Sequence, residues 1–380
     1  MKFKITRNLL LKHISRANKG IASKTTQEVL HNLYLEVLND RIRITGSNSS
    51  LRIETEILTS ENEDLQIQTI GSIIINAKLI TDIIRRMSDE IINLELIDQK
   101  TLRIFGENNP DTEFKIQTSN ENEYPSVEKS DFKNTYTMAT EVFSSVIKDV
   151  IFAISKLEIQ VVMTGVNLRF EDGKIYFVAT DSHRLSQRII DAPEVNSAFS
   201  VIIPGSNLNV LLGLLEEEKE VKMSVNDELV VFAFSDYNFY SRLITEKYPN
   251  TDAVFPKKSE TIVKADTREW LKAVERASII SSGNSSNMIT LTLNETDQNI
   301  TLSGVSDKED SYKEDLPFSE FSGENLTVHF NANFMLDALR AFESGETTMS
   351  FTGKRSPLTL ENENFGENFM QLVTPIVRYD

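Results

Sequence analysis

The segment Val201-Ile202-Ile203-Pro204-Gly205-Ser206-Asn207-Leu208 combines a short β-type run, a turn-like residue and the start of a helical run. The same order recurs in Ser72-Ile73-Ile74-Ile75-Asn76-Ala77-Lys78-Leu79-Ile80 and in Thr327-Val328-His329-Phe330-Asn331-Ala332-Asn333-Phe334. Aligned on Asn76, Pro204 and Asn331, the three copies stand at nearly equal intervals along the 380 residues. One strand-to-helix pattern repeated at equal spacing indicates a threefold internal repeat.

Two further patterns recur in phase with this segment. Each copy opens with a strand and a helix, in residues 2–5 and 7–21, 136–138 and 140–155, and 261–263 and 267–281. A strand, a turn and a strand follow, in residues 33–37 and 42–46, 166–170 and 175–179, and 289–293 and 300–304. The strands alternate apolar and polar residues, as half-buried antiparallel sheets do. The sequence therefore predicts an α+β fold of three repeated domains, each with two helices packed on antiparallel sheets, at residues 1–125, 126–252 and 253–380.

Composition limits the class of protein. The chain is 40% hydrophobic and 26% charged, has a formal net charge of −17 and contains no cysteine, so disulfides and cysteine-bound metals are excluded. It contains no apolar run long enough to span a membrane, and its first residues lack the pattern of a signal peptide. We therefore expect a cytoplasmic protein without membrane contact, and we disfavour a secreted repeat adhesin.

Basic side chains nevertheless gather on the predicted helices. On the first helix Lys12, Arg16 and Lys19 form a stripe beside the apolar one, and helix 267–281 repeats it with Arg268, Lys272 and Arg276. Further single charges on the predicted helices and directly after one of them are Lys78, Arg85, Lys148, Lys156 and Arg340. Basic faces on an acidic body predict a surface that attracts phosphate locally, and solvated helix faces are the alternative. Helix 205–218 departs from the pattern, because it has no Lys or Arg and ends in Glu216-Glu217-Glu218.

One string of residues carries a family resemblance. Ala179-Thr180-Asp181-Ser182-His183-Arg184-Leu185, with Met163-Thr164-Gly165-Val166 before it and Gln371-Leu372-Val373-Thr374-Pro375-Ile376 near the end, closely resembles the bacterial DNA polymerase III beta subunit, the replicative sliding clamp. The resemblance runs the whole length of the chain. It implies that the three domains of one chain form a half-ring. Two such chains would join head to tail as a homodimer around duplex DNA. The helices would line the hole, where the basic residues above and Lys24 would contact phosphates without reading sequence.

The resemblance also implies a groove in which short peptides of partner proteins dock. The expected partners are the DNA polymerase III alpha subunit, the clamp loader and other proteins that carry a clamp-binding motif. Carried over by position, the groove comprises Met163, Thr180, Ser182, His183, Arg184, Leu185, Pro249, Val254, Pro357, Leu372, Thr374, Pro375 and Ile376. The chain departs from the family pattern at Gln160-Val161 and at Ala253, so the resemblance is weaker at this rim.

Signals of catalysis and of bound cofactors are weak. Asp181, Ser182 and His183 are the residue types of a hydrolase triad, but adjacent residues on one turn cannot align a nucleophile with its base. The glycine-rich phosphate loops of nucleotide-binding proteins are absent from the sequence. Asp307, Glu309 and Asp310 read as a solvated acidic loop, and Trp270 as a packing residue although DNA stacking is the alternative. We therefore expect no enzyme activity, cofactor or metal. A clamp-like decoy that binds replication proteins without encircling DNA is the alternative function.

Overall fold

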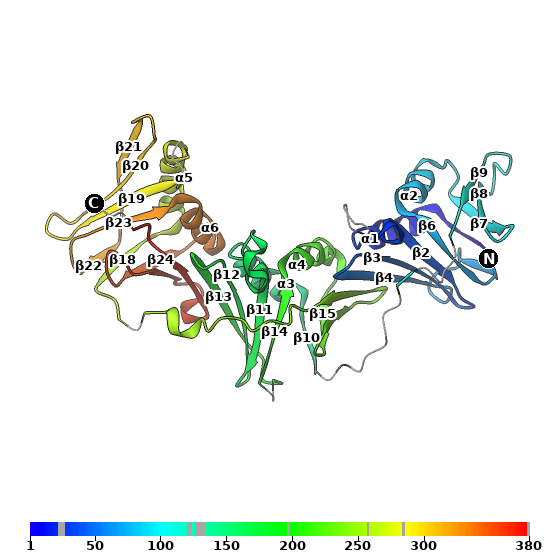
Figure 1. The fold of residues 1–380 in the computed structure, drawn as a ribbon, viewed down its shortest axis with the longest axis horizontal. Coiled ribbons are helices and arrows are strands. Elements are labelled where there is room, and N and C mark those ends of the chain that lie inside the picture. Colours follow the sequence, from blue (N-terminus) through cyan, green and yellow to red (C-terminus); the bar gives the residue numbers. More distant parts are fainter. Residues whose placement is uncertain are drawn as a thin grey trace. The chain divides into compact units, whose positions relative to one another are not determined.

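The computed structural model describes residues 1–21, 27–119, 124–125, 132, 134–195, 198–256, 258–282 and 286–377. The chain forms two compact units (Figure 1). The first contains Met1–Phe143 and Ser206–Leu243, and the second contains Ser144–Gly205 and Ile244–Asp380. The second predicted repeat therefore contributes strands to both units.

The described residues contain six α-helices: α1 (Arg7–Asn18), α2 (Ala77–Arg86), α3 (Thr140–Ile151), α4 (Gly205–Leu212), α5 (Thr267–Ser281) and α6 (Ala332–Phe342). Short 3₁₀ segments are η1 (Glu28–His31), η3 (Glu158–Thr164), η4 (Leu215–Glu217), η5 (Asp252–Val254) and η6 (Gly366–Asn368). No helix in the described ranges is long and apolar enough to cross a membrane.

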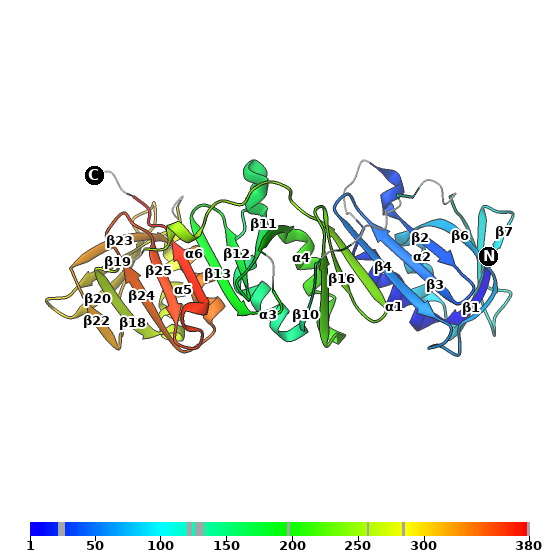
Figure 2. The same ribbon diagram turned by 90° about the horizontal axis from the view of Figure 1, so that it is seen from below.

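The first unit contains two antiparallel sheets. The five-stranded sheet has the order β5-β1-β7-β8-β9, formed by β1 (Lys2–Thr6), β5 (Gln66–Thr69), β7 (Ile91–Ile97), β8 (Thr101–Gly106) and β9 (Glu113–Gln117). The eight-stranded sheet has the order β10-β15-β16-β17-β4-β3-β2-β6. Its strands are β2 (Asn32–Val37), β3 (Arg41–Ser47), β4 (Leu51–Leu58), β6 (Gly71–Asn76), β10 (Asn134–Ala139), β15 (Glu220–Val225), β16 (Leu229–Ala233) and β17 (Tyr237–Arg242). Figure 2 shows β2, β3 and β4 side by side.

The second unit also contains two antiparallel sheets. The nine-stranded sheet has the order β14-β11-β12-β13-β26-β25-β24-β18-β22. Its strands are β11 (Gly165–Glu171), β12 (Lys174–Thr180), β13 (Arg184–Asp191), β14 (Phe199–Pro204), β18 (Thr261–Asp266), β22 (Glu320–Ser322), β24 (Glu346–Phe351), β25 (Leu358–Asn362) and β26 (Phe369–Val373). The four-stranded sheet has the order β21-β20-β19-β23, formed by β19 (Met288–Asn294), β20 (Asn299–Val305), β21 (Ser311–Asp315) and β23 (Leu326–Asn331).

The repeated strand-to-helix pattern and the α+β class are confirmed. β6 leads into α2, β14 into α4 and β23 into α6. Asn76 and Asn331 cap their helices, since their side chains accept hydrogen bonds from the backbone amides of Leu79 and Asn333. Three of the predicted helices, 7–21, 140–155 and 205–218, were too long at their C-terminal ends, whereas the helix predicted for 267–281 matches α5. The one predicted for 205–218 ends at Leu212 and resumes as η4, because Gly213, which follows it, is a poor helix former.

Two of the sheets cross from one repeat to the next. In the first unit β4 of the first repeat pairs with β17 of the second, with Ile53 opposite Phe239. In the second unit β13 of the second repeat pairs with β26 of the third, with Leu185 opposite Leu372. Backbone hydrogen bonds therefore continue across both junctions between repeats within the chain.

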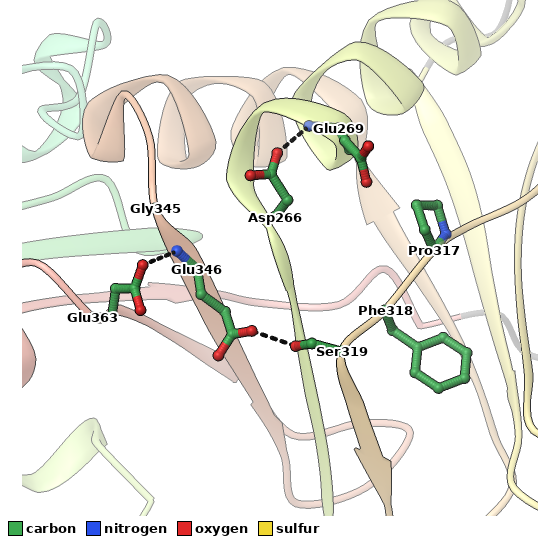
Figure 3. Close-up of a pocket in the computed structure, with 8 residues that line it drawn as sticks. All are labelled: Asp266, Glu269, Pro317, Phe318, Ser319, Gly345, Glu346 and Glu363. Carbon is green, nitrogen blue, oxygen red and sulfur yellow. Dashed lines mark hydrogen bonds between the residues drawn. The ribbon is translucent and has the colours of Figure 1, made fainter.

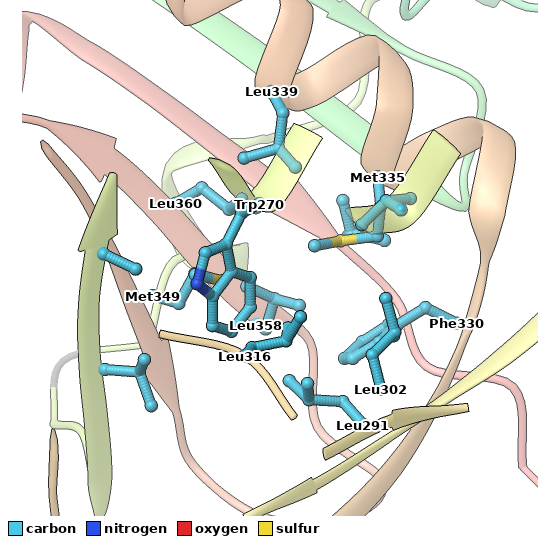
Figure 4. Close-up of a cluster of buried hydrophobic side chains, with 14 of the residues drawn as sticks. Trp270, Leu291, Leu302, Leu316, Phe330, Met335, Leu339, Met349, Leu358 and Leu360 are labelled. Atoms are coloured by element: carbon cyan, nitrogen blue, oxygen red, sulfur yellow. The ribbon is translucent and has the colours of Figure 1, made fainter. Parts of the chain in front are cut away.

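Corresponding helices pack on their sheets in the same way. The backbone of α1 approaches β3 so closely that a Cβ on Gly46 would lie 2.0 Å from the carbonyl oxygen of Ala17, and at Gly304 in β20 a Cβ would lie 3.2 Å from that of Ala277 in α5. Trp270 of α5 is fully buried among apolar side chains (Figure 4). Its Nε1 donates to the carbonyl oxygen of Pro317 at 2.8 Å. The packing role predicted for this tryptophan is confirmed.

Candidate DNA-facing cations and partner site

The basic stripe of α1 meets acceptors from the second repeat within the first unit. Lys12 is exposed, and its Nζ lies 2.8 Å from Oε2 of Glu217 in η4. Lys19 is also exposed, and its Nζ donates to the carbonyl oxygen of Gly213. The helix itself carries no acid, so its sequence gave no sign of these partners.

Arg16 departs from the exposed stripe that the sequence predicted. Its side chain is 8% exposed, its Nη1 lies 2.7 Å from Oδ1 of Asp236, and its guanidinium stacks 4.3 Å from the ring centre of Tyr237. It is buried because β17 brings the Asp236–Tyr237 turn against this side of α1. The prediction is corrected here: Arg16 is a buried contact between repeats.

His13 lies one turn before Arg16 and faces the same turn. Its Nε2 is 3.8 Å from Oδ2 of Asp236, and its Nδ1 shares a hydrogen bond with the hydroxyl of Thr55. Burial lowers the pKa of His13 to about 4, and the carboxylate of Asp236 opposes this shift only in part. The imidazole is therefore neutral near pH 7, and Arg16 is the cation that pairs with Asp236.

The basic stripe of α5 remains more accessible. Lys272 is exposed and has no carboxylate partner in the described part of the chain, while Arg268 donates to the carbonyl oxygen of Glu343 at 3.3 Å. Arg276 forms two hydrogen bonds to Glu314 of β21, at 2.7 and 3.0 Å, and its side chain is 48% exposed. Arg340 of α6 pairs with Glu275 of α5 at 3.0 Å.

The remaining predicted cations lie on or after other helices. Lys78, Lys148 and Lys156 are exposed and form no ion pair in the described ranges. Arg85 is exposed and approaches Asp82 only to 4.0 Å. Lys24 lies outside the described residues. Among the described residues, the predicted cations without a carboxylate partner are thus mainly lysines.

The predicted partner site centres on the turn between β12 and β13, in the second unit. The Asp181 carboxylate accepts hydrogen bonds from the backbone amides of His183 and Arg184, at 2.9 and 3.0 Å. This turn holds Ser182 at a φ of 77°, a left-handed conformation that is strained for a residue with a Cβ. The Ser182 hydroxyl donates to the sulfur of Met163 at 3.2 Å. The carboxylate thus orders the turn.

Arg184 is buried beneath this turn and ties the second repeat to the third. Its Nε donates to Asp181 at 3.0 Å and its Nη1 to Asp337 of α6 at 2.6 Å. Its guanidinium also lies 4.8 Å from the ring centre of Phe334. Truncating it would leave two carboxylates without their shared cation, so it supports the site structurally.

The apolar part of the predicted site is built on paired strands. Leu185 of β13 and Leu372 of β26 are buried together with Val178, and Tyr248 and Phe255 pack against them. The segment after β26 is held by His183, whose carbonyl oxygen accepts from the amide and the hydroxyl of Thr374 at 2.9 and 2.8 Å. Thr180 is buried, Pro249 and Val254 are exposed, and Pro357, Pro375 and Ile376 are half-buried.

A pocket of about 470 Å³ adjoins this turn in the same unit and contains residues that the sequence did not single out. It shares His183 and Arg184 with the predicted site and adds Asn333, Phe334, Leu336 and Asp337 from α6. The rings of His183 and Phe334 stack with their centres 6.3 Å apart. Asn333 and Phe334 end the third copy of the repeated motif, and Leu336 and Asp337 follow it, which was the signal available in the sequence.

A second pocket, of about 390 Å³, is lined by the carboxylates of Asp266, Glu269, Glu346 and Glu363 (Figure 3). Three of these already accept hydrogen bonds: Asp266 from the amide of Glu269, Glu363 from the amide of Glu346, and Glu346 from the hydroxyl of Ser319. The described residues contain no group of three or more side chains placed to hold a metal ion. These carboxylates cap a helix and fix a turn.

Comparison with known protein families matches the chain in three consecutive segments. Residues 1–128 match the N-terminal domain of the DNA polymerase III beta subunit, residues 137–250 its central domain, and residues 252–377 its C-terminal domain. The matches follow the order of the family's domains and together cover nearly the whole chain.

Individual relatives match over their full length. The chain is 30% identical over 385 residues to the beta sliding clamp of Bacillus subtilis and 29% identical to that of Staphylococcus aureus, with all of each chain covered. The crystal structure of the Bacillus subtilis sliding clamp superimposes with a TM-score of 0.94 at 28% identity over all of both chains. The DNA polymerase III beta chain of Streptococcus pneumoniae gives a TM-score of 0.94 at 26% identity, covering 99% of this chain and all of that one.

Proposed function

Because this chain belongs to the DNA polymerase III beta subunit family, we propose that two copies close into a ring around duplex DNA and hold the replicative polymerase on it. The chain is a DNA sliding clamp, a non-catalytic processivity subunit of DNA polymerase III. The observation that carries this function is the ordered match of all three family domains along one chain. The relatives reported above are clamps and beta subunits, which disfavours the decoy.

The pairing of the repeats supports a head-to-tail dimer. In order along each repeat, β4, β13 and β21 are equivalent strands, and so are β9, β17 and β26. Within the chain β4 pairs with β17 and β13 pairs with β26. The strands left over are β21 at one end of the third repeat's sheet and β9 at one end of the first repeat's sheet. The β9 strand of a second copy can pair with β21 of the first, and β9 of the first copy with β21 of the second. These two equivalent contacts close the two chains into a ring.

The two leftover strands have the properties of an unoccupied interface. Each has unpaired backbone groups along one edge, which natural proteins usually cover. Beside β21 the apolar side chains of Ile279 and Val305 are 72% and 52% exposed, and Phe114 on β9 is 37% exposed. Covering these side chains and completing the sheet would favour association.

The exposed cations of the helices would face the DNA. Lys78, Lys148, Lys156 and Lys272 form no ion pair among the described residues, and an ammonium can exchange one phosphate for the next as a ring moves along the duplex. Such contacts carry no sequence information, because phosphates are the same at every step. The strongly acidic remainder of the chain would discourage DNA from binding elsewhere.

The site around Leu185 and Leu372 would bind short apolar segments of partner proteins. Its buried aliphatic floor, with exposed Pro249 and Val254 beside it, suits a peptide with apolar anchors. We infer the DNA polymerase III alpha subunit and the clamp loader as partners, and the bacterial cytoplasm, where the chromosome is, as the place of action. Gln160 and Ala253 would adjust the affinity at this rim.

Retention on DNA of different topology tests this function. A clamp loader and ATP would load the full-length protein on nicked circular duplex, which is then passed through a gel-filtration column. We expect co-elution with the circle and loss of the protein when the circle is linearised, because a ring slides off a free end. Equal retention on both forms, or a monomeric mass at micromolar concentration, would contradict the ring.

A further inference from the structure

The cation at the start of the α1 stripe already has a carboxylate partner. Nζ of Lys12 lies 2.8 Å from Oε2 of Glu217, and Nη2 of Arg16 lies 3.9 Å from the same oxygen. Lys12 and Glu217 are 47% and 68% exposed, so this ion pair stands in solvent on the surface proposed to face DNA. An oxygen of Glu217 thus occupies a position that a DNA phosphate oxygen would need.

The pairing is specific to one carboxylate of three. Glu216, Glu217 and Glu218 follow one another at η4, but only Glu217 reaches a cation among the described residues. The hydrogen bond from Lys12 lowers the pKa of the Glu217 carboxyl group, so Glu217 is fully ionised at neutral pH. Glu216, which is exposed and forms no ion pair in the described ranges, has the same charge without the contact.

We propose that Glu217 is a built-in competitor of DNA phosphates, which occupies Lys12 and weakens the grip of the first repeat on duplex DNA. This inference rests on the proposed function, because it takes α1 to face the duplex. A surface ion pair contributes little net free energy, so an arriving phosphate can displace the carboxylate and the carboxylate can return. The exchange keeps each contact weak, as movement along DNA requires.

The described part of the third repeat shows no equivalent competitor. Counted from the start of its helix, Lys272 occupies the place in α5 that Lys12 occupies in α1. Lys272 has no carboxylate partner in the described part of the chain, whereas Lys12 has Glu217. The proposal therefore assigns unequal shares of the phosphate contact to two equivalent helices.

Substitution of Glu217 tests the proposal with a matched control. Binding of the full-length protein to a short fluorescent linear duplex would be followed by anisotropy over a range of NaCl concentrations. We expect Glu217→Gln to tighten binding about two- to fivefold more than Glu216→Gln. We also expect the slope of log K against log salt to steepen by up to about 0.9, the contribution of one additional phosphate contact. Both variants change the net charge equally, so their difference isolates the ion pair.

A second pair of variants locates the effect. In a Lys12→Ala background the advantage of Glu217→Gln over Glu216→Gln should disappear, because the cation that it releases is gone. Equal affinities for the two Gln variants, or a gain that survives in the Lys12→Ala background, would overturn the proposal. If the wild-type protein shows no salt-dependent binding and no retention on circular DNA, the proposed function fails instead.

Discussion

Helices α1 and α5 have a lysine and an arginine at the same two places, yet their arginines have different surroundings. Arg16 and Arg276 occupy the same place in the two helices, in each case directly before an alanine whose carbonyl meets a sheet glycine. Arg16 is 8% exposed and pairs with Asp236 of the following repeat, while Arg276 is 48% exposed and pairs with Glu314 of its own repeat. The difference arises because β4 is covered by β17 within the chain, whereas β21 ends its sheet.

In the proposed dimer, the second repeat fills the junction beside α1 within the chain, and the junction beside α5 is vacant until a second copy fills it. The second repeat fills the space beside α1, and in the same position of the third repeat apolar side chains such as Ile279 remain exposed. The site beside α5 therefore resembles the site beside α1 with its partner removed. If this holds, the two ends of the chain differ only in what covers them.

The largest effect is expected from a charge at the vacant junction. Ile279→Asp should weaken dimer formation by at least about thirtyfold, because it places a carboxylate where an apolar anchor would be buried. Sedimentation equilibrium over a range of protein concentrations measures this constant. Ile70→Asp is the matched control, since Ile70 is 53% exposed but follows β5, at the edge of its sheet opposite β9. Equal dimer dissociation constants for the two variants would contradict the proposed contact between the third repeat of one copy and the first repeat of the other.

A smaller effect is expected from removing the partner of each arginine. Asp236→Ala leaves the guanidinium of Arg16 buried without its carboxylate, and it should lower the free energy of unfolding by about 3 kcal/mol, the lower limit for a broken buried pair. Glu314→Ala should leave the urea midpoint unchanged, because Arg276 is already in water. Urea unfolding of both variants compares the two junctions, and equal losses would mean that burial does not separate them.

From the sequence alone we could predict features that depend on local periodicity, such as which side chains share one face of a helix. The stripes of Lys12 and Lys272 and the packing position of Trp270 follow from helical spacing, and the structure confirms that Trp270 is buried. The sequence could not predict the burial of Arg16 or the pairing of Lys12 with Glu217, which lies 205 residues away. Nothing near α1 in the sequence signals which repeat packs against it. Asp337 could not be predicted for the same reason, because its carboxylate accepts a hydrogen bond from Arg184 of another repeat.

The two units should respond to pH in opposite directions. The folded pKa of His13 is about 4 against 6.5 for the free side chain, so the unfolded chain binds a proton that the folded chain excludes. The first unit should therefore lose stability as the pH falls from about 6.5 to 4. Asp149 of α3, which stands at the place of Arg16 in α1, has a pKa raised to about 6 by burial, which Arg188 only partly offsets. Its protonation below pH 6 should stabilise the second unit.

Hydrogen exchange of peptides from each unit between pH 4 and 7 measures these responses. From the two shifts we expect changes on the order of 1–3 kcal/mol. His13→Gln should flatten the response of the first unit, and Asp149→Asn that of the second. Helix α5 has Ala273 at the place of His13, so its own packing should contribute no such slope. Slopes of the same sign in both units would contradict the assigned protonation states.

The smallest effect concerns the lysines at the same place in α1 and α5. Lys272→Ala should lower the salt slope of duplex binding by about 1, because a free ammonium contact is lost. Lys12→Ala should lower it by clearly less, since Glu217 already occupies that ammonium. Lys222→Ala on β15 controls for net charge, because this exposed lysine lies on a sheet and outside the helices. If Lys12 and Lys272 contribute equally to the salt slope, the phosphate displaces the Glu217 carboxylate from Lys12 without cost. The two helices then bind DNA equally. If Lys222 contributes as much as Lys272, the helices have no special share in the contact, and the difference between the two ends of the chain is confined to the protein interface.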